Sequence, residues 1–218
     1  MAIPANRRPA DRVAVRRGVW IALEGGEASG KSTQAKRLAD ALGAVLTREP
    51  GATPVGARIR ELLLDPTAPA LDARAEALLM AADRAEHVAI VVRPALEEGR
   101  VVVSDRSAWS SLAYQGYGRG LDVGELRRLS DWAMVGGWPD LAVLIDVPAE
   151  VARERLEAAG RPADRLESAG AAFHARVREG FRALAAESPA CWVIIDGDAR
   201  ADVVASRVRA AVERRIGE

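Results

Sequence analysis

A glycine-rich loop near the N-terminus has the residue types and spacing of a phosphate-binding site. Residues 25–32 satisfy the pattern G-x-x-x-x-G-K-[ST]. In that pattern the backbone N–H groups of the loop wrap phosphate oxygens, the lysine reaches the β- and γ-phosphates, and the next hydroxyl ligates Mg²⁺. We therefore expect a nucleoside triphosphate to bind here. The residues expected to contact it are Gly25, Gly26, Glu27, Ala28, Ser29, Gly30, Lys31, Ser32 and Thr33.

An acidic and a basic side chain follow a later apolar run. Residues 101–104 read Val-Val-Val-Ser, and Asp105 and Arg106 come directly after them. Ligands of open α/β sheets bind beyond the C-terminal ends of the strands. We therefore expect Asp105 to share a Mg²⁺ ion with Ser32, and Arg106 to clamp a phosphate. The alternative is an ordinary helix cap followed by a surface arginine.

A second group of arginines surrounds Gly160 and Pro162. Glycine and proline break a helix, which predicts a mobile connection between two helical stretches. An arginine-rich lid over about residues 153–168 could close over the nucleotide, exclude water and place positive charge on the transferred phosphoryl group. A solvated helix hairpin with surface ion pairs is the alternative. The arginines are Arg153, Arg155, Arg161 and Arg165.

The elements that must position these groups alternate along the chain. Short apolar runs of strand length occur at 19–23, 44–47, 101–104, 141–145 and 192–195. Stretches with helical spacing occur at 31–42, 54–64, 73–98, 107–114, 123–134, 149–158, 171–186 and 201–216. The strands show little polar alternation, as is typical of a parallel sheet covered on both faces. This order predicts an α/β fold with a five-stranded parallel sheet flanked by helices.

The length and composition limit the possible functions. The 218 residues suit one domain, which we expect over 19–218, preceded by a flexible basic tail over 1–18. The 31 basic and 31 acidic side chains cancel, which argues against disorder and against a surface built for nucleic acid. No apolar run approaches the roughly 20 residues that span a bilayer. A single cysteine, Cys191, fits a reducing cytoplasm.

Lysine is scarce, and this helps to separate classes of nucleotide-binding protein. Only Lys31 and Lys36 occur among the 31 basic residues. A guanine-specific GTPase reads its base with an Asn-Lys-x-Asp sequence, which this chain cannot form after Lys36. A compact phosphotransferase fits the length and the arginine-rich segment better than a switch or a motor protein.

Several further motifs occur in the order typical of one enzyme family. They are Thr-Arg-Glu-Pro-Gly-Ala-Thr-Pro at 47–54, Arg-Glu-Leu-Leu-Leu-Asp at 60–65, Ala-Ala-Asp-Arg at 81–84, Asp-Arg at 105–106, Leu-Ala-Tyr-Gln-Gly-Tyr-Gly-Arg-Gly at 112–120, Pro-Asp-Leu at 139–141 and Asp-Arg-Leu-Glu at 164–167. With the phosphate loop, they make the chain from about residue 20 onward resemble a bacterial thymidylate kinase. The resemblance implies a P-loop nucleoside monophosphate kinase fold with a small lid, transfer of the ATP γ-phosphoryl group to dTMP, a need for Mg²⁺, and a homodimer.

The resemblance also implies roles for individual residues. Glu27 would reach the sugar 3′-hydroxyl or the metal region, and Arg48 with Arg106 would hold the acceptor phosphate. A small residue at Ala28 is similar to the bacterial type, in which lid arginines supply the charge. On that pattern, the catalytic residues are Lys31, Asp105, Arg106, Arg161 and Arg165. The residues that contact the thymine are Arg84 and Gln115, with Ser111 and Met80 nearby.

Two positions depart from the family pattern. Met80 stands where an aromatic residue usually stacks on thymine, and Ser107 stands where an aromatic residue or histidine is usual. We expect weaker base stacking and laxer discrimination between deoxyribose and ribose. A kinase of another pyrimidine monophosphate, such as dUMP or UMP, therefore remains an alternative. A regulator that binds nucleotide without catalysis is a more remote one.

Overall fold

A computed structural model describes residues 17–135, 137–160 and 162–216. Within these residues, five strands form one sheet in the order β2-β3-β1-β4-β5, and every neighbouring pair is parallel. The α/β architecture with a five-stranded parallel sheet, predicted from the sequence, is confirmed. The strands are β1 (Trp20–Glu24), β2 (Val45–Arg48), β3 (Val102–Asp105), β4 (Leu141–Asp146) and β5 (Trp192–Asp196).

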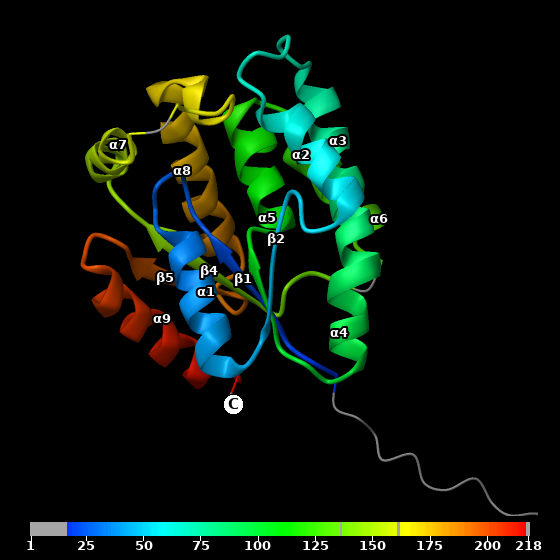
Figure 1. Cartoon of the computed structure of the whole chain (residues 1–218), viewed down its shortest axis with the longest axis vertical. Helices are drawn as coiled ribbons and strands as arrows, with labels where there is room; N and C mark the ends of the chain where they lie inside the picture. Colours follow the sequence, from blue (N-terminus) through cyan, green and yellow to red (C-terminus); the bar gives the residue numbers. More distant parts are fainter. Residues whose placement is uncertain (1–16, 136, 161, 217–218) are drawn as a thin grey trace, which may run out of the picture.

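Helices cover both faces of this sheet (Figure 1). The α-helices are α1 (Lys31–Leu42), α2 (Pro54–Leu64), α3 (Ala73–His87), α4 (Arg93–Glu97), α5 (Ala108–Ser111), α6 (Val123–Ala133), α7 (Ala149–Ala158), α8 (Ala171–Glu187) and α9 (Ala201–Ile216). Two π-helical turns, η1 (Val88–Val92) and η2 (Leu112–Gly118), and a 3₁₀ turn, η3 (Glu167–Ala169), complete the described elements.

The two faces of the sheet carry separate apolar cores. On one face Leu23 and Val143 pack with Val208 of α9 and with α1. On the other face Leu144 packs with Phe181 of α8 and with η2. All five residues of β1 are buried because the strand is central and covered on both sides.

The longest expected helix, 73–98, contains a π-helical turn. It runs as α3, η1 and α4, and the N–H of Arg93 donates to the carbonyl of Val88, five residues earlier. Pro94 follows this turn. A proline has no N–H and its ring crowds the carbonyl four residues before it, so the wider turn accommodates Pro94 without ending the helix. The helix expected at 107–114 likewise continues to Gly118 as η2.

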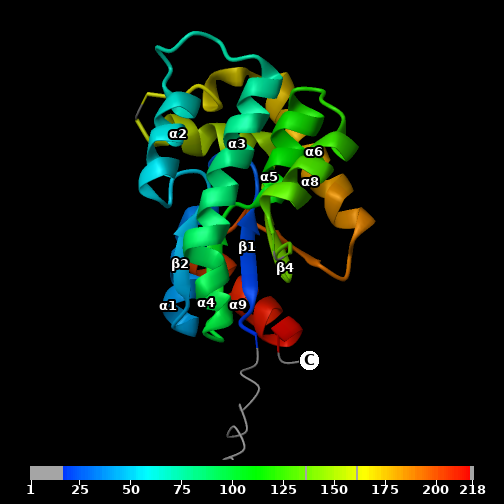
Figure 2. The ribbon, with the colours of Figure 1, turned by 90° about the vertical axis from the view of Figure 1, so that its right-hand side faces the viewer.

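The strand ends that carry polar residues lie at one edge of the sheet. Leu23 pairs with Asp105, and Arg48 of the outer strand β2 also pairs with Asp105. Figure 2 shows α2, α3 and α6 beyond this edge. The C-terminal ends of β1, β2 and β3 therefore supply one site.

The expected N-terminal tail lies outside the described residues up to position 16. Arg17 forms an ion pair with Asp140, and the N–H of Gly18 donates to the carbonyl of Leu96, so these two residues belong to the folded part. No helix in the described part of the chain combines the length and apolar character needed to cross a membrane.

Candidate active site

The phosphate loop joins β1 to α1 in the conformation that its glycines allow. Gly30 caps α1 with a φ of 89°, and Ala28 has a φ of 52°. A Cβ on Gly25 would lie 2.6 Å from the carbonyl oxygen of Ile145, so the loop passes too close to β4 for any side chain there. No side chain among the described residues caps the N-terminus of α1, so its first N–H groups can face a phosphate.

Lys31 lies inside this loop. Its Nζ donates to the carbonyl of Gly26 at 3.1 Å and lies 3.9 Å from the Glu27 carboxylate. Burial and the neighbouring Arg106 charge lower the pKa of Lys31. An added anion, such as a phosphate, would relieve both effects.

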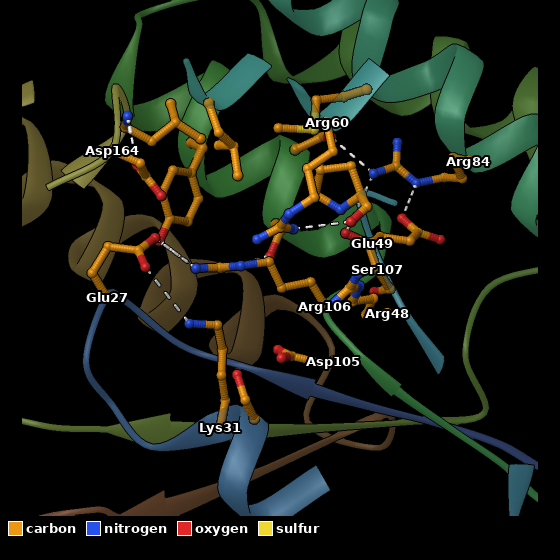
Figure 3. A pocket seen from close by; sticks show the side chains of 18 of the residues that line it. Glu27, Lys31, Arg48, Glu49, Arg60, Arg84, Asp105, Arg106, Ser107 and Asp164 are labelled. Carbon is orange, nitrogen blue, oxygen red and sulfur yellow. Dashed lines mark hydrogen bonds and ion pairs between the residues drawn. The ribbon is translucent and has the colours of Figure 1, made fainter. Parts of the chain in front are cut away.

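Arg106 extends from the end of β3 across the site (Figure 3). Its backbone has a φ of 75°, an uncommon conformation for a residue with a side chain. The guanidinium donates to the Gly25 carbonyl at 3.0 Å, to Glu27 at 2.7 Å, to the Tyr114 hydroxyl at 2.9 Å and to Ser110 at 3.1 Å. These contacts fix the arginine beside the phosphate loop.

Glu27 is the anionic centre of this group. Burial opposes its ionisation, but Arg106, Lys31 and the hydrogen bond from the Tyr114 hydroxyl outweigh burial and lower the pKa of Glu27 to about 2. Glu27 therefore remains charged at neutral pH. It lies between Lys31 and Arg106 and offsets part of their positive charge (Figure 3).

A cavity of about 290 Å³ connects the phosphate loop to helices α2, α3 and α5. Most of the side chains predicted as site residues line it, namely Glu27, Lys31, Ser32, Arg48, Met80, Arg84, Asp105, Arg106, Ser111 and Gln115. The cavity is also lined by Arg60, Tyr114 and Asp164, for which no role was predicted from the sequence. Each of these three residues lies within one of the family motifs, and this position could have marked it as a site residue.

The end of the cavity opposite Lys31 is organised around Arg84. Its guanidinium donates to Glu49 at 2.9 Å and to the Ser111 hydroxyl at 3.0 Å. Burial opposes ionisation of Glu49, but Arg84 and a hydrogen bond with His87 hold the pKa of Glu49 below its ordinary value. His87 is fully buried and also bonds Thr47, so it positions this network rather than binding a ligand.

Ser107 lines the cavity, but its hydroxyl is directed toward Glu24, which does not line it. It is fully buried and donates to Glu24 at 2.7 Å, and Ser110 donates to the other oxygen of Glu24 at 2.6 Å. Burial raises the pKa of Glu24 to about 7 against the effect of these two hydrogen bonds.

The residues proposed as metal ligands fit Mg²⁺. Ser32 and Asp105 line the same cavity, and within the described part of the chain the buried Oδ1 of Asp105 has no hydrogen-bond partner. A buried carboxylate oxygen without a partner calls for a cation or a donor. A hydroxyl and a carboxylate are oxygen ligands of the kind that Mg²⁺ uses together with substrate phosphates and water.

Of the two lid arginines predicted as catalytic, Arg165 is described by the structure and does not line the cavity. Arg161 lies outside the described residues. Arg165 donates to the Leu63 carbonyl at 2.7 Å and pairs with Glu76 at 3.1 Å, so it is directed toward α2 and α3 instead of toward Lys31. Arg155, by contrast, reaches the rim of the phosphate loop and donates to the carbonyl of Gly197 at 2.9 Å.

Comparisons with known proteins agree on one family. The thymidylate kinase family model matches residues 23–208. Thymidylate kinase from Leifsonia xyli subsp. xyli is 48% identical, with 99% of this chain and 100% of the relative covered. That from Clavibacter sepedonicus is 50% identical, with 88% and 93% covered. The crystal structure of thymidylate kinase from Ehrlichia chaffeensis superposes with a TM-score of 0.73 at 31% identity and covers 90% of this chain and 99% of that one. The chain belongs to the thymidylate kinase family.

Proposed function

We propose that the protein transfers the γ-phosphoryl group of ATP to the 5′-phosphate of dTMP and releases ADP and dTDP. The observation that carries this proposal is the single cavity with two chemically distinct ends. One end holds Lys31 and Ser32, and the other holds Arg84, Ser111 and Gln115. A nucleoside triphosphate at the first end and a nucleoside monophosphate at the second would meet at the basic side chains between them.

The chain's own residues supply mainly positioning and charge. Lys31 and the loop N–H groups would hold the β- and γ-phosphates of ATP, while Arg48 and Arg106 would hold the acceptor phosphate. A bond forms between an acceptor phosphate oxygen and Pγ as the bond from Pγ to the β-phosphate oxygen breaks. The acceptor phosphate and the γ-phosphate of ATP are both anions and must be held in line for this transfer. The enzyme therefore contributes mainly positioning and positive charge, and forms no covalent bond of its own.

We propose that Ser32 and Asp105 hold Mg²⁺. The ion, when bound, neutralises charge that develops on the phosphates. Asp105 supports this role because its Oδ1 is buried and no described residue hydrogen-bonds to it. We expect activity to disappear on chelation of divalent cations and to return on addition of Mg²⁺.

We further propose a lid over residues 153–168 that covers ATP. Arg165 is engaged with Glu76, which favours Arg161 as the lid arginine that reaches the transferred phosphoryl group. Asp164 supports a defined lid conformation, since its Oδ1 accepts from the N–H groups of Leu166 and Glu167 at 2.9 Å each.

A homodimer is the assembly that we propose. Exposed apolar side chains occur on α2, α3, η1 and α6, which lie on one side of the molecule (Figure 2). They are Val55, Leu62, Leu78, Ile90 and Trp132. Apolar side chains gathered on one face are typical of surfaces between protein chains.

We propose the cytoplasm as the site of action because the single Cys191 is a free thiol.

The decisive test is ADP formation from ATP with a panel of dTMP, dUMP, UMP, dCMP and CMP. We expect dTMP to be the best acceptor, and a different best acceptor would replace the proposal with another pyrimidine monophosphate kinase. Turnover with none of them would indicate a regulator.

The two lysines of the chain allow a test of the phosphate loop with a matched control. Lys31→Ala should lower kcat/KM on the order of 10³-fold because it removes charge from the transferring phosphates. Lys36→Ala should leave kcat/KM nearly unchanged, since Lys36 is exposed and pairs with Asp40 on the surface. Near-normal turnover of Lys31→Ala would contradict the mechanism.

A further inference from the structure

Glu76 of α3 is a fully buried carboxylate behind the cavity wall. It accepts from Gln115 Nε2 at 2.9 Å, from Arg119 Nε and Nη2 at 3.2 and 3.0 Å, and it pairs with Arg165 Nη2 at 3.1 Å. Two guanidinium groups compensate its buried charge. Glu76 does not itself line the cavity, so it cannot act on a substrate directly.

The carboxylate fixes which end of the Gln115 amide faces the cavity. An ionised carboxylate has only acceptors, whereas an amide group has an NH₂ donor and a carbonyl acceptor. The Gln115 amide must therefore turn Nε2 toward Glu76 and Oε1 away from it. Reversing the amide would place two acceptor oxygens against each other and leave a buried NH₂ group unpaired.

The other end of this amide has an unmet hydrogen-bonding need. Gln115 is fully buried and lines the cavity with Arg84 and Ser111, and its Oε1 has no hydrogen-bond partner among the residues that the structure describes. Such a buried acceptor requires a donor. The wall at this end of the cavity therefore presents an acceptor oxygen whose direction is set by a charge on the far side of the amide.

We infer that Glu76 is a specificity-determining positioning residue that makes Gln115 select an acceptor base with a ring N–H at position 3. This inference rests on the proposed function, in which a pyrimidine nucleotide occupies this end of the cavity. Thymine and uracil carry a hydrogen on N3 and can donate to Gln115 Oε1. Cytosine has a lone pair on N3, which would face the oxygen of Gln115 and be rejected.

Glu76→Gln tests the inference because it converts the acceptor-only group into an amide. Arg119 and Arg165 would draw the new carbonyl oxygen toward themselves, which leaves the new NH₂ group facing Gln115. Gln115 would then turn its Oε1 toward position 76 and its NH₂ toward the cavity. The altered wall would accept cytosine and repel thymine.

The experiment measures kcat/KM for dTMP and dCMP with wild type and Glu76→Gln. We expect the ratio of dTMP to dCMP to fall on the order of tenfold or more, as for the loss of one oriented hydrogen bond in a site. KM for ATP should be unchanged. Glu125→Gln, the same chemical change at an exposed position on the neighbouring helix α6, should leave the ratio as in wild type.

The possible failures are distinguishable. If wild type turns over dTMP well and Glu76→Gln loses activity equally toward both acceptors, Glu76 is only structural and the inference is wrong. If wild type phosphorylates no pyrimidine monophosphate, the proposed function itself has failed.

A measurement on wild type covers the case in which Glu76→Gln does not fold. The chain contains only two glutamines, Gln34 and Gln115, and one asparagine, so its side-chain amide NMR signals are few and separable. The pair of side-chain NH₂ signals that is missing from the spectrum of Gln115→Met belongs to Gln115. We expect its NH₂ protons to exchange slowly with water both before and after addition of dTMP. Loss of this protection on dTMP binding would show that the amide leaves Glu76, which would overturn the inference.

Discussion

Side chains of opposite charge hold one another in place around the phosphate loop. Glu27 lies between Lys31 and Arg106, and its pKa of about 2 keeps it charged at neutral pH. Glu27 thus holds the two cations beside the phosphate loop. Little rearrangement is then needed when ATP and the acceptor arrive.

Glu24 should make stability depend on pH. Burial raises its pKa from an ordinary value of 4.5 to about 7. Between these values the unfolded chain has released the Glu24 proton while the folded chain keeps it, so the free energy of unfolding falls as pH rises from 4.5 to 7. The fall due to this residue is up to about 3 kcal/mol. Denaturant unfolding at pH 4.5 and pH 7.5 measures it.

Glu24→Gln is the matching variant, since its amide can still accept from one of Ser107 and Ser110 and donate to the other. The free energy of unfolding of this variant should decrease less than that of wild type over the same pH interval. Equal losses in the two proteins would show that Glu24 does not carry this dependence.

Met80 and Ser107 should weaken recognition of the nucleoside. Both residues line the cavity without an aromatic ring, and the Ser107 hydroxyl donates to Glu24. We expect the kcat/KM ratio of dTMP over UMP to be lower than in a family member with aromatic residues at both positions. Met80→Phe should lower KM for dTMP about two- to tenfold through stacking, with KM for ATP unchanged. Equal ratios in the two enzymes would refute this expectation.

Residue types at fixed spacing made part of the site predictable. Residues 25–33, Asp105 and Arg106 were predicted because a phosphate loop and a strand end determine where such side chains lie. Glu49 and Glu76 received no role, because their function depends on partners 35 and 39 residues away in sequence. Such pairings follow from how helices pack, which the spacing of residues along one element does not encode.

At the scale of elements, the π-helical turn η2 packs unusually closely on α8. A Cβ on Gly180 of α8 would lie 2.6 Å from the ring of Tyr117, and a Cβ on Gly118 would lie 2.6 Å from the ring of Phe173. Small residues thus allow the segment that carries Gln115 to lie against α8. Periodicity predicted a helix here, but not the extra residue per turn that distinguishes a π-helix.

Gly180→Ala should therefore be destabilising, although alanine is the better helix former. The added methyl group would overlap Tyr117 and force a backbone or rotamer shift at a cost of about 1–3 kcal/mol. Urea unfolding measures the loss. Glu179→Ala, at the adjacent exposed position of the same helix, should stay within about 0.5 kcal/mol of wild type. A stabilised Gly180→Ala would mean that the close packing is absent.

At the scale of the whole molecule, strand order decides which loops form the site. The chain passes from β1 to the outer strand β2 and returns to β3 between them. The phosphate loop, Arg48 and Asp105 therefore come together at neighbouring strand ends. The number of strands and their parallel direction followed from alternating apolar runs and helices. Their order did not, because it depends on which strands pair and not on their composition.

The proposed dimer is testable at this same scale. Leu78 on α3 is 58% exposed, and Trp132 on α6 is 78% exposed. Leu78→Glu would place a charge in the apolar contact, where burial without a partner is costly. Sedimentation at micromolar concentration should show a dimer for wild type and a monomer for Leu78→Glu. Val203→Glu on α9, away from these two helices, should remain dimeric, and a monomeric wild type would exclude the assembly.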